Sequence, residues 1–222
     1  MRFKEVIKIN FKEIINIYSD RSDFFIELLF QHITICGVAI LIASIIGIFV
    51  GIIISEYKIT TSPVLSIVNF IYTIPTIALL GFLIPISGIG DTTAVIALSI
   101  YALLPMVRST YTGIQTIDPS IIEAAKGMGS TNFQILYKIK LPLAITVILS
   151  GLRNMTVMTI ALGGIASFIG AGGLGIAIYR GITTNNSGLT IAGSLLIAAL
   201  ALVIDLFIGQ IEKFIKKKWR FV

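Results

Sequence analysis

The sequence predicts an all-α integral membrane protein with about five transmembrane helices and a cytoplasmic loop between two of them. Of its 222 residues, 56% are hydrophobic and only 13% are charged, which is too apolar for an ordinary soluble domain. Several uncharged apolar runs reach about 20 residues, the length that crosses about 30 Å of hydrocarbon as a helix. The net charge of +6 comes from basic residues spread over the ends and loops, without an aromatic-interleaved patch, so we exclude nucleic-acid binding.

The first two predicted spans cover residues 33–54 and 63–86. The first span carries no charge, and its Gly47 and Gly51 have the GxxxG spacing that lets another helix approach closely. Pro75 lies in the middle of the second span. We expect a kink there, because proline cannot donate the helical hydrogen bond.

Three further spans follow toward the C-terminus. One begins after the helix-starting cluster Asp91-Thr92-Thr93 and continues to about residue 107, one covers residues 142–163, and the last covers residues 189–211. The glycine-rich stretch 163–182 is expected to be a short or re-entrant element buried in protein, because irregular backbone facing lipid would leave its polar groups unsatisfied. The last span is followed by five cations and an interfacial tryptophan: Lys213, Lys216, Lys217, Lys218, Arg220 and Trp219.

The charges around the spans predict the orientation. The loop around Asp91 holds no Lys or Arg, whereas the C-terminal tail is strongly basic. We therefore place the tail inside the cell and, with five spans, the N-terminus outside. Residues 1–31 are expected to form an N-terminal amphipathic segment, and residues 32–222 a single membrane domain. His32 and Cys36 are the only histidine and cysteine, so we predict no metal site and no disulfide, and we place His32 at the membrane interface where the first span begins.

The polar loop between the third and fourth spans has its own local signals. Asp118-Pro119-Ser120 is a strong helix start, since Asp118 can cap free amides and proline suits the first helical position. Gly127 and Gly129 can end that helix in a left-handed turn. Ser130 or Thr131 can then cap a second short helix through Lys140, before Pro142 restarts the chain toward the membrane. The loop is therefore predicted to be a helix, a tight turn and a second helix on the cytoplasmic side.

The run EAAKGMGSTNFQILYKIKLP in this loop resembles the cytoplasmic signature of ABC importer permeases. It holds a Glu-Ala-Ala triplet, a glycine four residues after the second alanine, and a distal Ile-x-Leu-Pro. The resemblance implies the type I ABC importer permease fold, in which residues 118–142 form a coupling-helix loop that docks onto a separate ATPase. An ordinary amphipathic loop helix is the alternative. The ATPase-docking residues that the resemblance implies are Glu123, Ala124, Ala125, Gly127, Gly129, Leu141 and Pro142, with the Glu123 carboxylate as a partner for an ATPase cation.

The chain has no Gly-Lys-Ser/Thr sequence with which to cradle nucleotide phosphates. The resemblance therefore implies that the chain is not itself an enzyme, holds no cofactor, and works with an ABC ATPase dimer that binds ATP and Mg²⁺. Gly170, Gly172 and Gly175 form a GxGxxG string, but no predicted strand precedes it. We do not interpret that string as a dinucleotide site.

The second and fourth spans resemble the permeases of osmoprotectant importers, which carry glycine betaine, carnitine and choline. Methionine importer permeases share the fold and a similar Gly-Ala-Gly-Gly-Leu-Gly string, so methionine-type amino-acid transport is one alternative. An ATP-independent channel or secondary carrier is the alternative from another class. The further partners implied are an extracytoplasmic substrate-binding protein, a second permease copy or paralogue, and membrane lipid. The residues that carry the likeness are Thr73, Ile74, Pro75, Ala78, Leu79, Leu80, Gly88, Gly90, Gly151, Arg153, Phe168, Ile169, Gly170, Gly172, Gly173, Leu174 and Gly175.

Several residues within the spans are candidates for the transport pathway or for helix packing. Arg153 lies about 16 Å along the helix from Pro142, where an unpaired cation is costly, and we predict that it pairs with Asp205 of the last span. A pathway role for Arg153 is the alternative. Trp219 is the only tryptophan and lies in the tail, so we expect tight recognition of a cation in the binding protein rather than here. The other candidates are Tyr72, Pro75, Tyr101, Gly170, Gly172 and Gly173.

Overall fold

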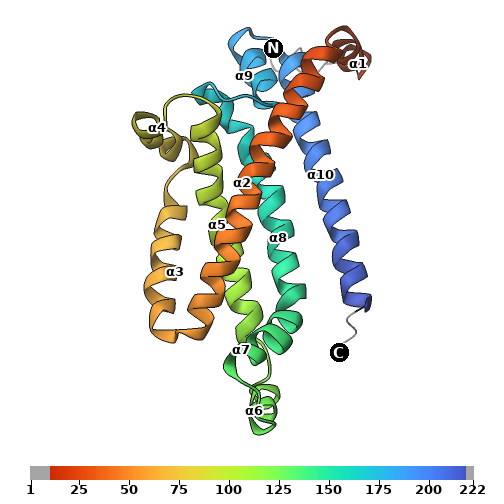
Figure 1. The fold of residues 1–222 in the computed structure, drawn as a ribbon. Helices are drawn as coiled ribbons and strands as arrows, with labels where there is room; N and C mark the ends of the chain where they lie inside the picture. Colours follow the sequence, from red (N-terminus) through yellow and green to blue (C-terminus); the bar gives the residue numbers. More distant parts are fainter. Residues whose placement is uncertain (1–10, 219–222) are drawn as a thin grey trace, which may run out of the picture. The chain divides into compact units, whose positions relative to one another are not determined.

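The computed structural model describes residues 11–218, and these form helices without any strand (Figure 1). The predicted all-α class is therefore confirmed. A π-helical turn, Leu136–Lys140, joins α7 to α8, and a 3-10 turn, Ile165–Ile169, follows α8. The α-helices are α1 (Phe11–Asp20), α2 (Ser22–Glu56), α3 (Lys58–Thr73), α4 (Thr76–Ser87), α5 (Asp91–Gln115), α6 (Pro119–Gly127), α7 (Asn132–Ile135), α8 (Leu141–Gly163), α9 (Gly175–Thr183) and α10 (Ser187–Lys218).

Four helical stretches are long and apolar enough to cross a membrane: Ser22–Glu56, Asp91–Gln115, Asn132–Gly163 and Ser187–Lys217. Helices α3 and α4 meet that description only together, as a broken pair, which brings the number to at most five. This agrees with the predicted number of about five.

Some predicted boundaries differ from the observed ones. Helix α2 begins at Ser22 rather than at residue 33, so the expected boundary between residues 31 and 32 falls inside a helix. Helix α5 continues beyond residue 107 to Gln115, and Arg108 is exposed on its side and does not end it.

The predicted kink at Pro75 is a complete break. Pro75 has φ −56° and ψ 136°, an extended conformation, and α4 begins after it. Proline lacks the amide hydrogen and disfavours helical geometry in the residue before it. The chain therefore leaves α3 at Thr73 and starts a new helix at Thr76.

The chain folds as two compact units. Unit 1 contains the segments up to Ile40, Ile74–Ser99 and Val157–Val203. Unit 2 contains Leu41–Thr73, Ile100–Thr156 and the segment from Ile204 onward.

In unit 1 the glycine-rich stretch packs closely against α2. A Cβ atom at Gly163 would lie 2.6 Å from the Cys36 Sγ, and one at Gly173 would lie 2.9 Å from the His32 Nδ1. His32 is 1% exposed, and its Nε2 lies 3.0 Å from the Ile160 carbonyl oxygen. His32 therefore does not lie at a helix entrance as predicted, because α2 starts well before this residue and presents it to packed backbone. The prediction of a short buried element is confirmed for the 3-10 turn, in which Ala166, Ser167 and Ile169 are buried. The end of the stretch forms the further helix α9, in which Tyr179 and Ile182 are exposed.

In unit 2 the GxxxG pair of α2 does bring another helix close. A Cβ atom at Gly47 would lie 2.7 Å from the Met106 Cβ, and one at Gly51 would lie 2.5 Å from the Thr110 Cβ. Real Cβ atoms do not approach so closely, so only glycine fits at either position. The two glycines therefore allow α2 and α5 to pack at close backbone distance.

Candidate functional site

The first helix of the cytoplasmic loop starts where the sequence predicts. The Asp118 carboxylate accepts a hydrogen bond from the Ser120 backbone amide at 2.8 Å, and Pro119 occupies the first turn. The hydrogen bonds from the Ser120 amide and then its hydroxyl lower the pKa of Asp118 below its ordinary value. The cap is therefore charged at neutral pH and complements the positive end of α6.

The turn that ends α6 depends on Gly129. This residue has φ +81°, in the left-handed region, and its amide donates to the Lys126 carbonyl at 2.9 Å. The Ser130 amide donates to the Ala125 carbonyl at 3.0 Å, which closes the helix end. Gly127 is the last helical residue and has no positive φ, so its predicted part in the left-handed turn is wrong.

The second helix of the loop is continuous with α8. Thr131 begins α7 with a reciprocal cap, since its Oγ1 accepts from the Gln134 amide and the Gln134 Oε1 accepts from the Thr131 amide at 2.8 Å. The predicted restart at Pro142 is wrong, because Asn132–Gly163 is a single helical stretch of 32 residues. The π turn accommodates the proline: the Leu141 amide reaches back to the Leu136 carbonyl, and this wider turn relieves the clash that Pro142 causes in a regular helix. Helices α7 and α8 are therefore continuous through the π turn.

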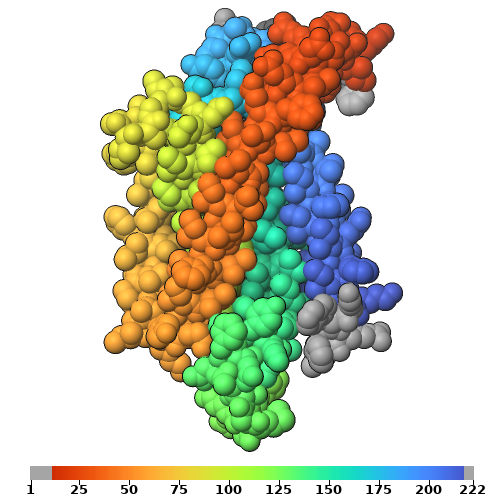
Figure 2. All heavy atoms as spheres, in the orientation of Figure 1, coloured from red at the N-terminus to blue at the C-terminus, as the bar shows by residue number. Residues whose placement is uncertain are grey.

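The predicted docking residues differ in their exposure. Glu123 and Ala124 are exposed on α6, and no ion pair of Glu123 occurs within residues 11–218. Ala125 is only 1% exposed, so it packs inside the loop and does not present a small side chain to a partner. Leu141 and Pro142 are half-buried at the start of α8. In Figure 2 the segment that contains α6 and α7, in green, protrudes at one end and is not covered by other parts of the chain on the face shown.

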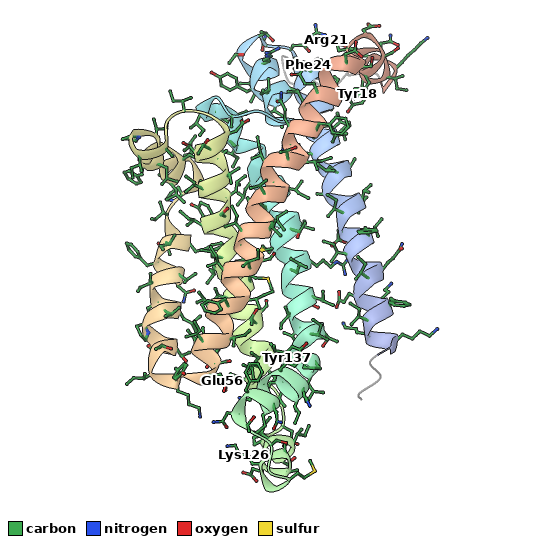
Figure 3. The ribbon with its side chains drawn as sticks, in the orientation of Figure 1. Tyr18, Arg21, Phe24, Glu56, Lys126 and Tyr137 are labelled. Atoms are coloured by element: carbon green, nitrogen blue, oxygen red, sulfur yellow. The ribbon has the colours of Figure 1, made fainter. Side chains whose placement is uncertain are left out.

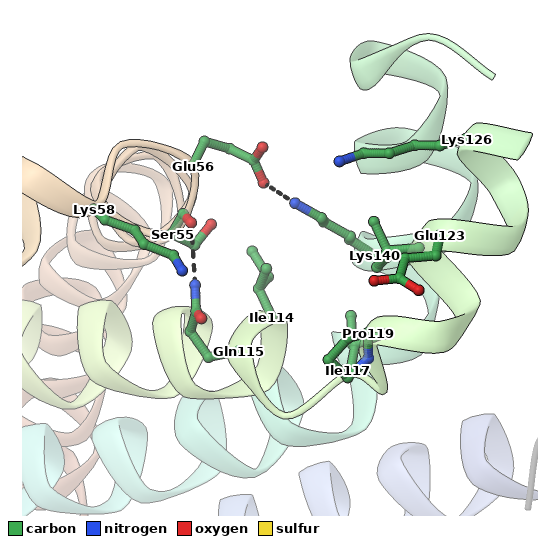
Figure 4. Close-up of a pocket in the computed structure, with 11 residues that line it drawn as sticks. Ser55, Glu56, Lys58, Ile114, Gln115, Ile117, Pro119, Glu123, Lys126 and Lys140 are labelled. Atoms are coloured by element: carbon green, nitrogen blue, oxygen red, sulfur yellow. Dashed lines mark hydrogen bonds and ion pairs between the residues drawn. The ribbon is translucent and has the colours of Figure 1, made fainter. Parts of the chain in front are cut away.

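A pocket of about 360 Å³ lies between the end of α2, the end of α5 and α6 (Figure 4). Its charged lining consists of the side chains of Glu56, Lys58, Glu123, Lys126 and Lys140. The Lys140 Nζ lies 2.5 Å from the Glu56 Oε1, which ties the π turn to the end of α2. In Figure 4 the Glu123 carboxylate and the Lys126 ammonium group project from α6 beside this pair. The pocket therefore offers both signs of charge to a docking partner.

Two exposed aromatic residues of the loop are an addition to the predicted set. Phe133 and Tyr137 are 74% and 66% exposed, and their rings stack with a centroid distance of 6.4 Å. In Figure 3 Tyr137 lies at the same end of unit 2 as Glu56 and Lys126. The signal in the sequence is an aromatic pair at i and i+4 within a polar segment, which places both rings on one helical face. Exposed apolar side chains of this kind are available for contact with a partner protein or with the membrane.

The predicted pair of Arg153 and Asp205 is present in unit 2. The Arg153 Nε and NH2 groups donate to the two carboxylate oxygens of Asp205, each at 2.5 Å. Two further residues beside the Arg153 guanidinium, Glu212 and Gly209, were not predicted from the sequence. Glu212 lies 3.8 Å from the Arg153 guanidinium, and a Cβ atom at Gly209 would lie 3.1 Å from the Arg153 Cζ. Gly209 therefore leaves the space that the guanidinium occupies between α8 and α10.

Glu212 extends this group of charges along α10. Its Oε1 accepts hydrogen bonds from the Ser150 hydroxyl at 2.7 Å and from the Lys216 ammonium group at 2.6 Å. The result is a connected set of polar side chains that fixes α8 to α10.

The remaining candidates lie in two places. Tyr72 and Tyr101 of unit 2 meet edge to face with a centroid distance of 5.9 Å, and Tyr101 is buried, so this pair packs α3 against α5. In unit 1, Gly170 and Gly173 have φ +75° and +100°. The Gly172 amide donates to Asp91 at 2.7 Å. These glycines therefore shape the turn that joins the 3-10 turn to α9. Pro75, the remaining candidate, lies between α3 and α4 and outside both helices. Trp219 and Arg220 of the predicted basic tail lie outside the described residues.

Comparison with known proteins finds similarity to transport permeases along most of the chain. Residues 29–217 match the family described as "Binding-protein-dependent transport system inner membrane component". The glycine betaine/carnitine/choline transport system permease protein OpuCD of Bacillus subtilis (strain 168) is 38% identical over 92% of this chain and 92% of its own. The carnitine transport permease protein OpuCD of Listeria monocytogenes serotype 1/2a (strain 10403S) is 37% identical over 91% of each chain.

A solved structure supports the fold. A chain of the MetNI methionine ABC transporter, in an inward-facing conformation, aligns with a TM-score of 0.79 over 86% of this chain and 95% of that chain, at 24% identity. That likeness concerns the fold alone. With the family match and the two relatives, it leads to one conclusion: the chain belongs to the family of binding-protein-dependent transport system inner membrane components, the membrane permeases of ABC importers.

Proposed function

We propose that this chain is the permease subunit of an ATP-driven importer for quaternary ammonium osmoprotectants, namely glycine betaine, carnitine and choline. The observation that carries the proposal is the likeness, over nine-tenths of the chain, to permeases that are named for these compounds. Methionine remains the alternative cargo, because the solved relative of similar fold belongs to a methionine transporter. Its low sequence identity makes this the weaker candidate.

The cytoplasmic loop is the proposed entry point for force from an ABC ATPase dimer, which would hold ATP and Mg²⁺. Three features support this. Glu123 offers a carboxylate that has no ion pair among residues 11–218, the stacked Phe133 and Tyr137 offer an apolar contact, and α7 continues into α8 without a break. Closing of the ATPase dimer would then tilt α8 and change which side of the membrane the pathway faces. A second permease copy or paralogue and an extracytoplasmic binding protein complete the transporter.

The test is reconstitution of the permease with its ATPase and binding protein in proteoliposomes, followed by uptake of labelled glycine betaine with and without ATP. We expect uptake that needs all three components and that unlabelled carnitine or choline inhibits. Competition by methionine alone would assign the chain to the methionine class. Uptake by the permease without the ATPase would identify an ATP-independent carrier or channel.

A charge substitution tests the docking role separately. We expect Glu123→Lys to abolish uptake and ATPase association while the protein still inserts at normal levels, since it places a cation where a partner cation is expected. Lys138→Glu, an exposed charge change on the same loop outside the pocket, serves as the control. Full uptake by a stably inserted Glu123→Lys variant would contradict the role of this residue.

A further inference from the structure

A line of polar side chains runs along one face of α3. Ser62, Ser66, Asn69 and Thr73 are spaced by four, three and four residues, so they share a face of this helix. The two serines and Thr73 are exposed and Asn69 is half-buried. We call these four residues the α3 polar face. The Thr73 hydroxyl donates to the Phe70 carbonyl of its own helix at 2.7 Å. Hydrocarbon offers no partners for the two serine hydroxyls and the Asn69 amide group, so this face is poorly suited to lipid contact.

Arg108 of α5 borders the α3 polar face. Its guanidinium NH2 donates to the Asn69 Oδ1 at 2.9 Å, and its side chain is exposed. Arg108 and Gln115 are seven residues apart, so the arginine lies about 10 Å inside the end of α5. This position is within a helix that is long and apolar enough to cross the membrane.

The two arginines of unit 2 that lie inside such helices differ in their partners. Arg153 is bound by both oxygens of the Asp205 carboxylate. Arg108 has a neutral amide as its hydrogen-bond partner, and no carboxylate lies within ion-pair distance of it among residues 11–218. A guanidinium has five N–H donors, so Arg108 keeps donors that need water or an anion. A cation in a membrane domain that has no acidic partner must reach water, either in a water-filled space or at the membrane interface. The polar residues of α3 beside Arg108 favour the water-filled space.

We propose that the α3 polar face and Arg108 line a water-filled part of the transport pathway, and that Arg108 contacts the carboxylate of a zwitterionic substrate. This inference rests on the proposed import of quaternary ammonium compounds. Glycine betaine and carnitine carry a carboxylate beside the ammonium group, whereas choline carries the ammonium group alone. A fixed guanidinium in the pathway attracts the first two and repels the third, so it selects among substrates that share the same cationic group.

The water-filled path is tested by thiol labelling in the assembled transporter. In a Cys36→Ala background, single cysteines replace Ser66 and Thr73 on the polar face, and Ile67 serves as the control. Ile67 is 60% exposed but lies about 100° around the helix from Ser66, away from Asn69. The probe is 2-(trimethylammonium)ethyl methanethiosulfonate, a quaternary ammonium reagent that reacts with thiolates, which form only in contact with water.

We expect the cysteines at positions 66 and 73 to react at least about tenfold faster than the one at position 67, because only a hydrated thiol ionises. Protection by excess glycine betaine would agree with a shared path. Slow reaction at positions 66 and 73, at the rate of position 67, would overturn the assignment and identify the face as lipid-facing. Disulfide cross-links between two permease copies through positions 66 and 73 would overturn it as well and identify a dimer interface.

The contact with the substrate carboxylate is tested by the ratio of glycine betaine uptake to choline uptake. Arg108→Gln should lower this ratio about threefold or more, the size expected for a partly exposed ion pair, while Arg108→Lys keeps the charge and most of the ratio. An unchanged ratio in Arg108→Gln would refute the contact. If the wild-type transporter imports neither compound, the proposed function fails, whereas the labelling rates still decide whether the α3 polar face is hydrated.

Discussion

Gly129→Ala is the substitution whose effect on the cytoplasmic loop can be worked out most directly. Gly129 has φ +81°, and a Cβ atom there would meet no other atom within 4 Å. The cost of the alanine is therefore confined to the backbone, because nothing clashes with the added methyl group. A left-handed conformation costs an alanine about 1–2 kcal/mol relative to glycine.

This cost acts on the equilibrium between the observed turn and other turns. A difference of about 1.4 kcal/mol changes an equilibrium about tenfold, so the substitution shifts the population of the turn about five- to thirtyfold. Apparent affinity falls with the fraction of the binding-competent conformer. The ATPase should therefore bind Gly129→Ala more weakly by up to that factor, with the full effect reached when another turn becomes the main conformer.

Two matched variants separate the backbone effect from other causes. Gly129→Asn should bind nearly as well as the wild type, because asparagine tolerates the left-handed conformation. Gly81→Ala places the same methyl group at a helical position of α4 that has open space around it and lies outside the docking loop, and should be neutral. The assay is titration of the ATPase onto the permease in nanodiscs, together with ATP hydrolysis stimulated by the loaded binding protein. Wild-type binding by Gly129→Ala, or an equal loss in Gly81→Ala, would refute the reasoning.

Three further predictions concern other parts of the molecule. Exchanging the charges of Arg153 and Asp205 in a double variant should restore part of the transport that either single reversal abolishes, and a double variant no better than the singles would argue against direct pairing. Gly175→Ala should greatly reduce the amount of folded protein in the membrane, measured by size-exclusion profile, because its Cβ would lie 2.1 Å from the Gly164 carbonyl oxygen; a normal profile would contradict the close packing described for unit 1. Phe133→Ala should weaken ATPase binding without lowering protein levels, since this side chain is exposed in the free permease, and unchanged binding would remove it from the proposed interface.

The sequence predicted the features that depend on neighbouring residues. The cap at Asp118, a cap at Ser130 or Thr131 and the left-handed turn at Gly129 were all recognisable, because the groups that they satisfy lie within a few positions along the chain. Pro142 misled the prediction because a π turn, which has no simple sequence signal, accommodates it within one continuous helix. Ala125 was predicted to present a small side chain to a partner but is buried, because the sequence does not show which face of the helix packs against the rest of the loop.

The sequence by itself determined that this chain is a helical membrane protein with a capped cytoplasmic loop, since apolar run length and capping chemistry are local properties. It also predicted the pair of Arg153 and Asp205, because a cation in an apolar run has very few available partners. Only the tertiary structure decided that His32 is buried against a carbonyl 128 positions away and that Arg108 meets Asn69 across 39 positions. Neither contact has a local signal, because the relative rotation and depth of packed helices depend on the whole set of side chains between them.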